Sequence, residues 1–299
     1  MTLEQTLRWN KIKDGLFYFV VYSGISFFCL LIVYPFYYIF INSLNTELIY
    51  GAAVFWPSKI GIRNYVTLLS ESNIVWSLCL SMIRVAVGGT LAVLVNSMCA
   101  FALRRRALRF RNFYLVFFLI PMFFKGGLIP VYLNLKMLGL LDTFFVFIFP
   151  EPRLFNFFYV IILMTYFADI PDSVEDSAKI DGAGYFTIYW KIYMPMSVPV
   201  IATIFLFAAV FHWETWLDSL YFTHSESLET FAAFLMKAIK KFASIGEDHT
   251  GRAESLMEMT HLQGIRFTGM IVAILPVLAI YPFIQKYFVK GIKLGAVKE

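Results

Sequence analysis

The chain has 299 residues, of which 60% are hydrophobic and 15% are charged. A soluble globular domain has about 25% charged residues, so this composition excludes an ordinary soluble protein. The formal net charge is +5, but the basic residues lie in short segments between apolar runs, which argues against nucleic-acid binding. The three cysteines, Cys29, Cys79 and Cys99, lie inside apolar runs without metal-ligand spacing and are interpreted as small core residues.

Six apolar runs reach the length that a helix needs to cross a bilayer, about 20 residues. They lie at about 15–41, 75–103, 112–135, 143–168, 200–222 and 267–288. The first run is too long for the apolar core of a signal peptide, and no small-residue cleavage site follows it. Positive charge marks the cytoplasmic side of a membrane protein. The clearest cytoplasmic signal is the arginine cluster after the second run, made of Arg104, Arg105, Arg106, Arg109 and Arg111. The sequence therefore predicts an all-α membrane protein with six transmembrane helices and both termini in the cytoplasm.

Charged or helix-breaking residues interrupt three of these runs. Arg84 lies within the second run. An intramembrane arginine is a candidate functional residue, but we expect it near the outer end, with its side chain extended to the interface. Gly126 and Gly127 predict a break in the third run, which is tolerated only where protein or a water-filled cavity satisfies the backbone. In the fourth run, Glu151 and Arg153 either pair or face a polar cavity, or the helix begins only after Arg153 and the preceding residues form a re-entrant or interfacial piece.

The segment 169–199, between the fourth and fifth runs, is polar and has a design of its own. Pro171 predicts a helix start with Asp172 or Ser173 as the N-cap, and we expect the helix over Val174–Asp181. A glycine-containing turn and a second amphipathic piece, with aromatic residues at helical spacing, follow. Small side chains around the turn would let the backbone of another protein come close. The segment is therefore interpreted as a cytoplasmic docking element; the alternative is a plain loop that covers lipid headgroups.

The residues at 175–183, Glu-Asp-Ser-Ala-Lys-Ile-Asp-Gly-Ala, with Met194, Pro195 and Pro199 after them, resemble the EAA loop of bacterial ABC importer permeases. The Ile-Asp-Gly-Ala form is similar to the carbohydrate-uptake branch with its MalG-like permeases, and within it to the LplC/YtcP-type oligosaccharide permeases. The resemblance implies a type I ABC importer fold in which this EAA coupling loop docks on a partner ATPase.

The coupling role that the resemblance implies falls on a defined set of residues. They are Glu175, Asp176, Ser177, Ala178, Asp181, Gly182, Ala183 and Pro195. Glu175 and Asp181 are expected to anchor the contact, and Gly182 is expected to set the turn. Asp176 and Ser177 replace the more usual Glu-Ala or Ala-Ala of the family pattern, in a helix that tolerates both changes.

Two further segments carry the same resemblance. Residues 126–132, Gly-Gly-Leu-Ile-Pro-Val-Tyr, are similar to the LplC/YtcP-type permeases. The basic tail at 286–299 is expected to be cytoplasmic and resembles the carbohydrate permease tail that reaches between the ATPase subunits. The tail residues that this implies as ATPase contacts are Leu294, Gly295, Ala296, Val297 and Lys298. A positively charged flank that stops transfer is the alternative.

The far end of the fifth run concentrates polar and aromatic side chains. His212 and Glu214 are two residues apart and do not share a helix face, so no metal site is predicted. Glu214 and Asp218 do share a face. With Trp213 and Trp216 they could line a sugar path, because aromatic faces stack on sugar rings and carboxylates accept hydrogen bonds from hydroxyls. A span end buried against a partner, or an interfacial aromatic belt, explains the pattern equally well. The family has a Trp-Asn-Asp-Trp type sequence here, from which His212 and Glu214 depart.

The sequence contains no phosphate-binding loop and no hydrolase or metal-site motif. The chain is therefore not expected to be an enzyme or to bind a cofactor. The resemblance implies that ATP and Mg²⁺ bind to two partner ATPase subunits. It also implies a second homologous permease in a heterodimer, an extracytoplasmic solute-binding protein, an oligosaccharide substrate and a bacterial cytoplasmic membrane location.

In this interpretation, residues 1–299 form one permease domain that provides half of an alternating-access path. By its placement, the extracytoplasmic loop at 223–266 resembles the loop of maltose-type permeases that enters the binding protein. The alternatives are an ABC permease for a non-sugar solute and a stand-alone secondary transporter or intramembrane enzyme. Neutral and charged oligosaccharides both stay open as substrates, and so does the presence of a sugar site on this subunit.

Overall fold

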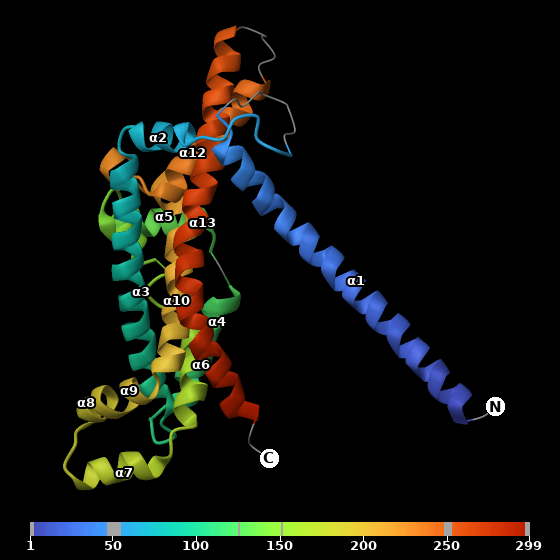
Figure 1. Ribbon diagram of the computed structural model, residues 1–299. Coiled ribbons are helices and arrows are strands. Elements are labelled where there is room, and N and C mark those ends of the chain that lie inside the picture. Colours follow the sequence, from blue (N-terminus) through green and yellow to red (C-terminus); the bar gives the residue numbers. More distant parts are fainter. Residues whose placement is uncertain (1–2, 47–54, 125, 151, 248–252, 297–299) are drawn as a thin grey trace. The chain divides into compact units, whose positions relative to one another are not determined.

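The computed structural model describes residues 3–46, 55–124, 126–150, 152–247 and 253–296. The chain forms two compact units. Unit 1 contains residues 1–70 and 239–272, and unit 2 contains residues 71–238 and 273–299. The regular elements of the described residues are helices, as Figure 1 shows, apart from one isolated bridge between Asn45 and Ile60. The all-α prediction is confirmed for this part of the chain.

Unit 1 is built on α1, Leu3–Leu44, and α2, Arg63–Ser70. The start of α2 is bonded to the end of α1, where the Asn64 side-chain amide donates to the carbonyl oxygens of Ser43 at 3.1 Å and Asn45 at 2.8 Å. The side chains of α1 from Leu16 to Phe36 are largely exposed and apolar. The surface of α1 over this length is therefore mainly apolar, which suits contact with lipid.

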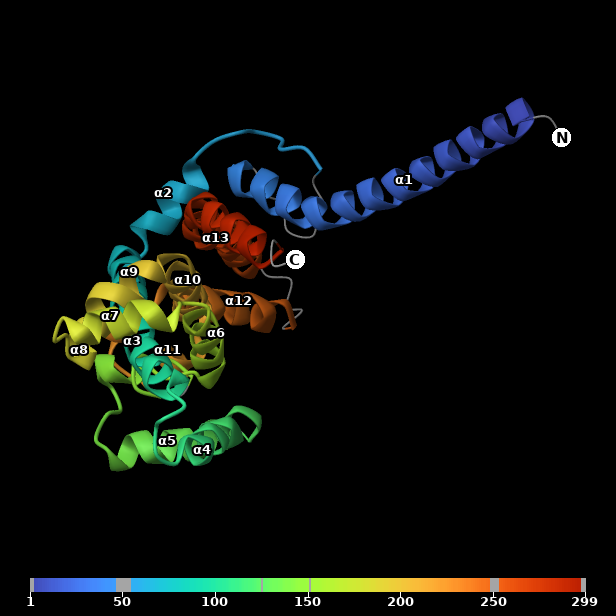
Figure 2. The same ribbon diagram turned by 90° about the horizontal axis from the view of Figure 1, so that it is seen from below.

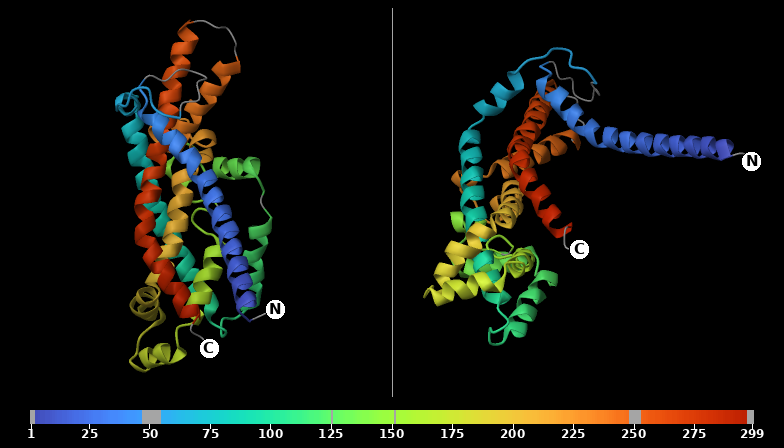
Figure 3. Two further views of the ribbon diagram at one scale, coloured as in Figure 1. Left: turned by 45° about the vertical axis from the view of Figure 1, so that its right-hand side comes forward. Right: turned by 60° about the horizontal axis from the view of Figure 1, so that its bottom comes forward.

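The core of unit 2 is a bundle of three helices that lie side by side in Figures 1 and 3. They are α3, Ile74–Arg104; α6, Phe157–Ala168; and α10, Val198–Glu214. Small residues allow close packing of α3 against α10. A Cβ atom at Gly88 would lie 2.4 Å from Nε2 of His212, and one at Gly89 would lie 3.0 Å from the Phe205 ring.

The predicted break in the third run is confirmed. Helix α4, Arg111–Phe123, and helix α5, Leu128–Met137, meet at an angle of 116°, and Figure 3 shows the corner between these two green helices. In the fourth run, the prediction that the helix begins only after Arg153 is confirmed, and a re-entrant or interfacial position of the preceding residues stays a prediction. A short 3₁₀ helix, η1, Phe144–Phe147, precedes irregular chain, and α6 begins only at Phe157. The Asn156 side chain caps α6 by accepting from the amide of Phe158 at 3.0 Å.

The fifth run is also broken, which the sequence analysis did not predict. After α10 ends at Glu214, a short helix, α11, follows over Leu217–Tyr221, and then a 3₁₀ turn, η3, over Glu226–Leu228. The chain beyond it, within the segment predicted as an extracytoplasmic loop, forms α12, Phe231–Glu247. The last helix, α13, runs over Ala253–Ala296 and contains both Pro276 and Pro282.

Within the described residues, four helices are long and apolar enough to cross a membrane, or up to six if each bent helix pair counts as one span. Helix α6 has 12 residues and is therefore about 18 Å long, which is shorter than the roughly 30 Å hydrocarbon core. The fourth crossing would thus need the irregular residues before Phe157 as well. Six spans and a cytoplasmic location of both termini stay predictions.

The predicted docking segment lies at one end of the α3, α6 and α10 bundle, as Figures 1 and 2 show. It contains α7, Asp172–Ile180; α8, Tyr185–Ile188; a π-helical turn, η2, Tyr189–Tyr193; and α9, Met194–Met196. Helix α7 turns 77° away from α6. The segment is therefore a helix-turn-helix, as the sequence predicted.

Candidate functional site

Helix α7 starts and stops for different local reasons. The predicted cap by Asp172 or Ser173 is wrong, because the helix already begins at Asp172 and its N-cap, Pro171, has no side-chain hydrogen bond. Instead, the Asp172 carboxylate accepts from Nη2 of Arg104 at 2.7 Å. The acidic residues of the first turn still favour the helix N-terminus electrostatically.

The predicted turn at Gly182 is confirmed, with a φ of 83° that glycine adopts without strain. The amide of Ala183 donates to the carbonyl of Ala178 at 2.9 Å, and the amide of Gly182 donates to that of Lys179 at 3.0 Å. These two bonds form a Schellman motif, which satisfies the last carbonyl groups of the helix.

Glu175 is the only buried residue of α7 and is 6% exposed. Its carboxylate accepts from the hydroxyl of Tyr193 at 2.9 Å and lies 3.1 Å from Nη2 of Arg105 and 3.1 Å from Nζ of Lys179. Nη1 of Arg104 is 3.4 Å away and also donates to the Tyr193 hydroxyl. Glu175 therefore lies at the inner wall of the pocket described below, and its predicted contact with a partner stays a prediction.

These contacts set the protonation states of Glu175 and Tyr193. Burial raises the pKa of Glu175, but the hydrogen bonds from Lys179 and Tyr193 and the charges of Arg105 and Lys179 outweigh it, so that the pKa lies below its usual value. Burial, together with the hydrogen bond to Glu175, raises the pKa of Tyr193 to about 12. The carboxylate is therefore ionised and the phenol is a donor at neutral pH.

The other residues predicted for coupling lie on the outer side of the segment. Asp176, Ser177, Asp181, Gly182 and Pro195 are exposed, and Ala178 and Ala183 are half-buried. The sequence analysis did not single out Ile180, which is 87% exposed at the end of α7. Its signal was available, since it is a large apolar side chain in an otherwise polar helix.

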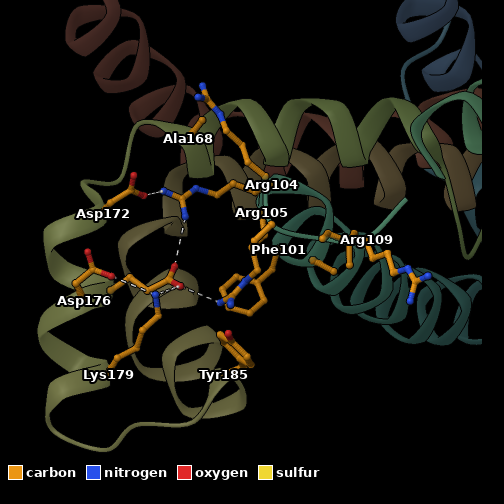
Figure 4. Close-up of a pocket in the computed structure, with 14 residues that line it drawn as sticks. Phe101, Arg104, Arg105, Arg109, Ala168, Asp172, Asp176, Lys179 and Tyr185 are labelled. Carbon is orange, nitrogen blue, oxygen red and sulfur yellow. Dashed lines mark hydrogen bonds and ion pairs between the residues drawn. The ribbon is translucent and has the colours of Figure 1, made fainter. Parts of the chain in front are cut away.

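A pocket of about 910 Å³ lies between this segment and the arginine cluster. Arg104, Arg105 and Arg109 line it on one side, and Asp176 and Lys179 of α7 line it on the other. Figure 4 shows Arg104 directed at Asp172, and Lys179 directed at Asp176. The sequence analysis used these arginines only as a topology signal and missed their contacts with α7, because 71 residues separate Arg104 from Glu175.

The predicted tail contacts fall at the end of α13. Leu294, Gly295 and Ala296 belong to its last turn, whereas Val297 and Lys298 lie outside the described residues. In Figures 1 and 3, this end of α13 lies at the same end of unit 2 as α7. The arrangement is compatible with one partner that touches both, and the tail contact stays a prediction.

A second cavity, of about 900 Å³, lies where the broken helices of unit 2 meet. Its lining includes Gly127 at the α4–α5 corner, Arg153 before α6, and Glu214, Trp216 and Asp218 at the α10–α11 break. Three residues of the predicted sugar path therefore share this cavity. The fourth, Trp213, does not line it. Its indole N–H donates to the carbonyl of Ala273 at 2.8 Å, and the side chain is 8% exposed.

Asp218 is fully buried and binds two arginines. Arg84 donates to its Oδ2, and Arg153 donates to it through Nη2 and, at 3.0 Å, through Nε. The expectation that Arg84 extends to the interface is wrong. Its side chain is fully buried and has partners there. Besides Asp218, these include the carbonyl of Thr215, which lies at the α10 break and accepts from Nη1 of Arg84 at 2.9 Å. Glu151, which the sequence offers as a partner of Arg153, lies outside the described residues.

Among the residues that the structure describes, no group of three or more His, Cys, Asp and Glu side chains is placed to hold a metal ion.

The matching family model is that of the binding-protein-dependent transport system inner membrane component, and it covers residues 88–294. The chain belongs to this family. The match includes the docking segment, the arginine cluster and all the cavity-lining segments, so that both sites described above lie within the family's shared region.

Relatives of this permease are similar over nearly its whole length. The polygalacturonan/rhamnogalacturonan transport system permease protein YtcP of Bacillus subtilis (strain 168) is 34% identical over 291 residues, which cover 96% of this chain and 100% of YtcP. Protein LplC of the same strain is 33% identical over 89% of both chains. The predicted resemblance to the LplC/YtcP-type permeases is confirmed.

The fold of this permease is similar to that of solved importers. A chain of a bacterial ABC transporter involved in the import of the acidic polysaccharide alginate matches with a TM-score of 0.80 and 27% identity, covering 92% of this chain and 98% of that one. A second chain, from a bacterial alginate ABC transporter in complex with an alginate pentasaccharide-bound periplasmic protein, matches with a TM-score of 0.60 and 15% identity, which shows the fold alone.

Proposed function

We propose that this permease is one of two membrane subunits of an ABC importer for oligosaccharides in a bacterial cytoplasmic membrane. The observation that carries the proposal is α7. It is an amphipathic helix with an exposed outer side, it ends in a Schellman motif, and it lies at the end of the bundle next to the arginine cluster. A helix of this kind offers a partner a rigid surface. The identity to YtcP, which is named as a permease protein of a polygalacturonan/rhamnogalacturonan transport system, supports the sugar assignment.

The proposed cycle follows from this arrangement. A loaded solute-binding protein docks on the outer face, and two ATPase subunits, which bind ATP and Mg²⁺, close beneath the two permeases. Closure displaces α7, and the helices of the permease shift as rigid bodies to give alternating access. The exposed Asp176, Asp181 and Gly182 are proposed to meet the ATPase. This chain itself hydrolyses nothing in the scheme.

The cavity at the broken helices is the proposed segment of the sugar path. Discontinuous helices at membrane depth are tolerated where they line a cavity, and three breaks meet here. Trp216 would stack on a sugar ring, and the exposed Glu214 would accept from hydroxyls. Asp218 would act through Arg153, which it holds at the cavity wall. Trp213 would support the wall from behind.

We propose further that the oligosaccharide carries carboxylates. Arg84 and Arg153 share the carboxylate of Asp218, and Glu214 adds a second carboxylate at the same cavity, so these four groups have no net charge. The proposal therefore rests on the guanidinium of Arg153, which lines the cavity and would donate charge-assisted hydrogen bonds to a sugar carboxylate. The relatives named above for polygalacturonan/rhamnogalacturonan and for the acidic polysaccharide alginate support the same class.

ATP hydrolysis by the complete complex in lipid tests this function. The complex contains both permeases, both ATPase subunits and a binding protein loaded with trigalacturonate, and wild type is compared with Gly182→Asp. We expect loaded binding protein to stimulate the wild type, and the variant to lose this stimulation because any side chain is strained at a φ of 83°. Normal hydrolysis and transport by the variant would show that the segment is a plain loop without a role in coupling. Transport without any ATPase would favour a secondary transporter.

A further inference from the structure

We propose that the pocket between the arginine cluster and the coupling segment, residues 169–199, binds the headgroup of an anionic phospholipid. In this site, Arg106 and Arg109 would donate to the lipid phosphate, and the exposed face of α4 would contact the acyl chains. The site is separate from the sugar cavity, and lipid binding there is a property beyond the proposed transport function.

The side chains that line this pocket carry more positive than negative charge. Five cationic side chains face three carboxylates, which leaves an excess of two positive charges. The cations are Arg104, Arg105, Arg106, Arg109 and Lys179, and the carboxylates are Asp172, Glu175 and Asp176. An excess of this sign favours an anionic ligand. The volume of about 910 Å³ lies within the range of about 300–1,000 Å³ that is typical of ligand pockets.

The three carboxylates of the pocket are neutralised by only three of its cations. Arg104, Arg105 and Lys179 pair with all of them, at nitrogen–oxygen distances between 2.7 and 3.4 Å. Within the part of the chain that the structure describes, Arg106 and Arg109 have no carboxylate partner, and both residues are exposed. These two guanidinium groups are therefore available to a ligand. Their planar donors match the oxygen atoms of a phosphate group.

The inner wall of the pocket is held in place by stacked side chains. The guanidinium carbon of Arg105 lies 4.6 Å from the ring centroid of Phe101 and 3.8 Å from that of Tyr185, and Figure 4 shows the three side chains together. Phe101 belongs to α3 and Tyr185 begins α8, so this stack joins two separate elements. A pocket with fixed walls binds a ligand at a lower cost in conformational entropy.

The pocket lies where two candidate membrane spans end. Helix α3 is long and apolar enough to cross a membrane and ends at Arg104, and α4, which belongs to a bent candidate span, begins at Arg111. Residues 105–110 therefore connect two spans at one membrane surface. The arginine cluster predicts that this surface is cytoplasmic, where the leaflet contains anionic lipids. Basic pockets between transmembrane helices on this side bind anionic headgroups.

An exposed aromatic face continues from the pocket onto α4. The guanidinium carbon of Arg109 lies 4.9 Å from the ring centroid of Phe110. Phe110, Phe113 and Phe117 follow one another at helical spacing and are all exposed. The rings of Phe113 and Phe117 stack, with their centroids 6.0 Å apart. Because this face is apolar and next to the pocket, a lipid with acyl chains fits the site better than a free phosphate ion.

Native mass spectrometry of the complete complex in detergent tests the site. The complex contains both permeases and both ATPase subunits and is titrated with phosphatidylglycerol, and the variants are Arg106→Gln and Arg109→Gln. We expect each variant to bind phosphatidylglycerol about fivefold more weakly, which is the contribution of one basic residue near an anionic lipid surface. Phosphatidylcholine has the same phosphate but no net charge, and it should bind more weakly than phosphatidylglycerol to the wild type.

Lys191→Gln is the matched control. Lys191 is an exposed cation of the coupling segment that does not line the pocket, so its variant should bind the lipid as the wild type does. Equal binding by the wild type and both arginine variants would overturn the proposal. Loss of ATPase subunits from the arginine variants in proportion to the lost lipid would assign these arginines to the ATPase instead. Displacement of the lipid by an equal concentration of inorganic phosphate would identify a site for free phosphate and refute the lipid assignment.

Discussion

Asp218 is the residue on which the buried charge of unit 2 depends, because both Arg84 and Arg153 pair with it. Asp218→Asn would leave two buried guanidinium groups without an anion. Removal of one partner from a buried ion pair costs about 3–5 kcal/mol. We expect a lower yield of folded protein and a markedly lower thermal midpoint in detergent. Glu214→Gln is the control, since it changes an exposed carboxylate at the same cavity and should keep the wild-type midpoint. Equal midpoints for both variants would contradict this role of Asp218.

The protonation of Glu175 gives a prediction at the same scale. Burial raises its pKa, but the bonds from Lys179 and Tyr193 and the nearby positive charges lower it below the ordinary value of 4.5. A depressed folded-state pKa stabilises the fold above the unfolded-state pKa, and this contribution is lost as the pH falls through the folded-state pKa. We therefore expect amide exchange in α7, corrected for intrinsic rates, to stay constant from about pH 7 to pH 5. Loss of protection near pH 6 would show that the carboxylate is not held in this way.

At the scale of elements, the packing of α3 on α10 depends on Gly88. A Cβ atom there would lie 2.4 Å from Nε2 of His212, so Gly88→Ala overpacks the contact. Overpacking of this kind costs about 1–3 kcal/mol. We expect a lower thermal midpoint for Gly88→Ala and recovery when His212→Ala is added. Gly24→Ala in α1 should not lower the midpoint, because nothing lies within 4 Å of that position. No recovery in the double variant would place the strain elsewhere.

The elements also explain which features could be predicted from the sequence. The break at Gly126–Gly127 and the turn at Gly182 are local properties, and both were predicted correctly. The cap of α7 was not, because Asp172 pairs with Arg104, 68 residues away, instead of with its own helix. The burial of Arg84 was missed for the same reason, since its partner Asp218 is 134 residues away. Spacing along the chain reports local contacts only.

At the scale of the whole molecule, the proposed function requires that two separate sites within unit 2 be linked. The coupling segment lies at the Arg104 end of α3, and the cavity lies near Arg84 on the same helix. These two residues are 20 positions apart, which corresponds to about 30 Å along α3. Helices α4, α6 and α10 all end or break within this length, whereas α3 does not. Helix α3, which like α13 is unbroken, is therefore suited to carry a displacement, and the broken helices are suited to form a path.

The substrate class gives the last prediction. Arg153→Gln removes the guanidinium that lines the cavity and leaves Arg84 and Asp218 as a balanced pair, so the fold should persist. In the complete complex, we expect the variant to lose about tenfold in trigalacturonate transport, as for a charge-assisted hydrogen bond. The same oligosaccharide with its carboxylates reduced to alcohols should be transported equally by both proteins. Trp216→Ala should lower the transport of both oligosaccharides, because stacking does not depend on the charge of the sugar. If Arg153→Gln impaired the charged and reduced sugars alike, Arg153 would act only in holding the cavity wall, and the carboxylate assignment would be wrong.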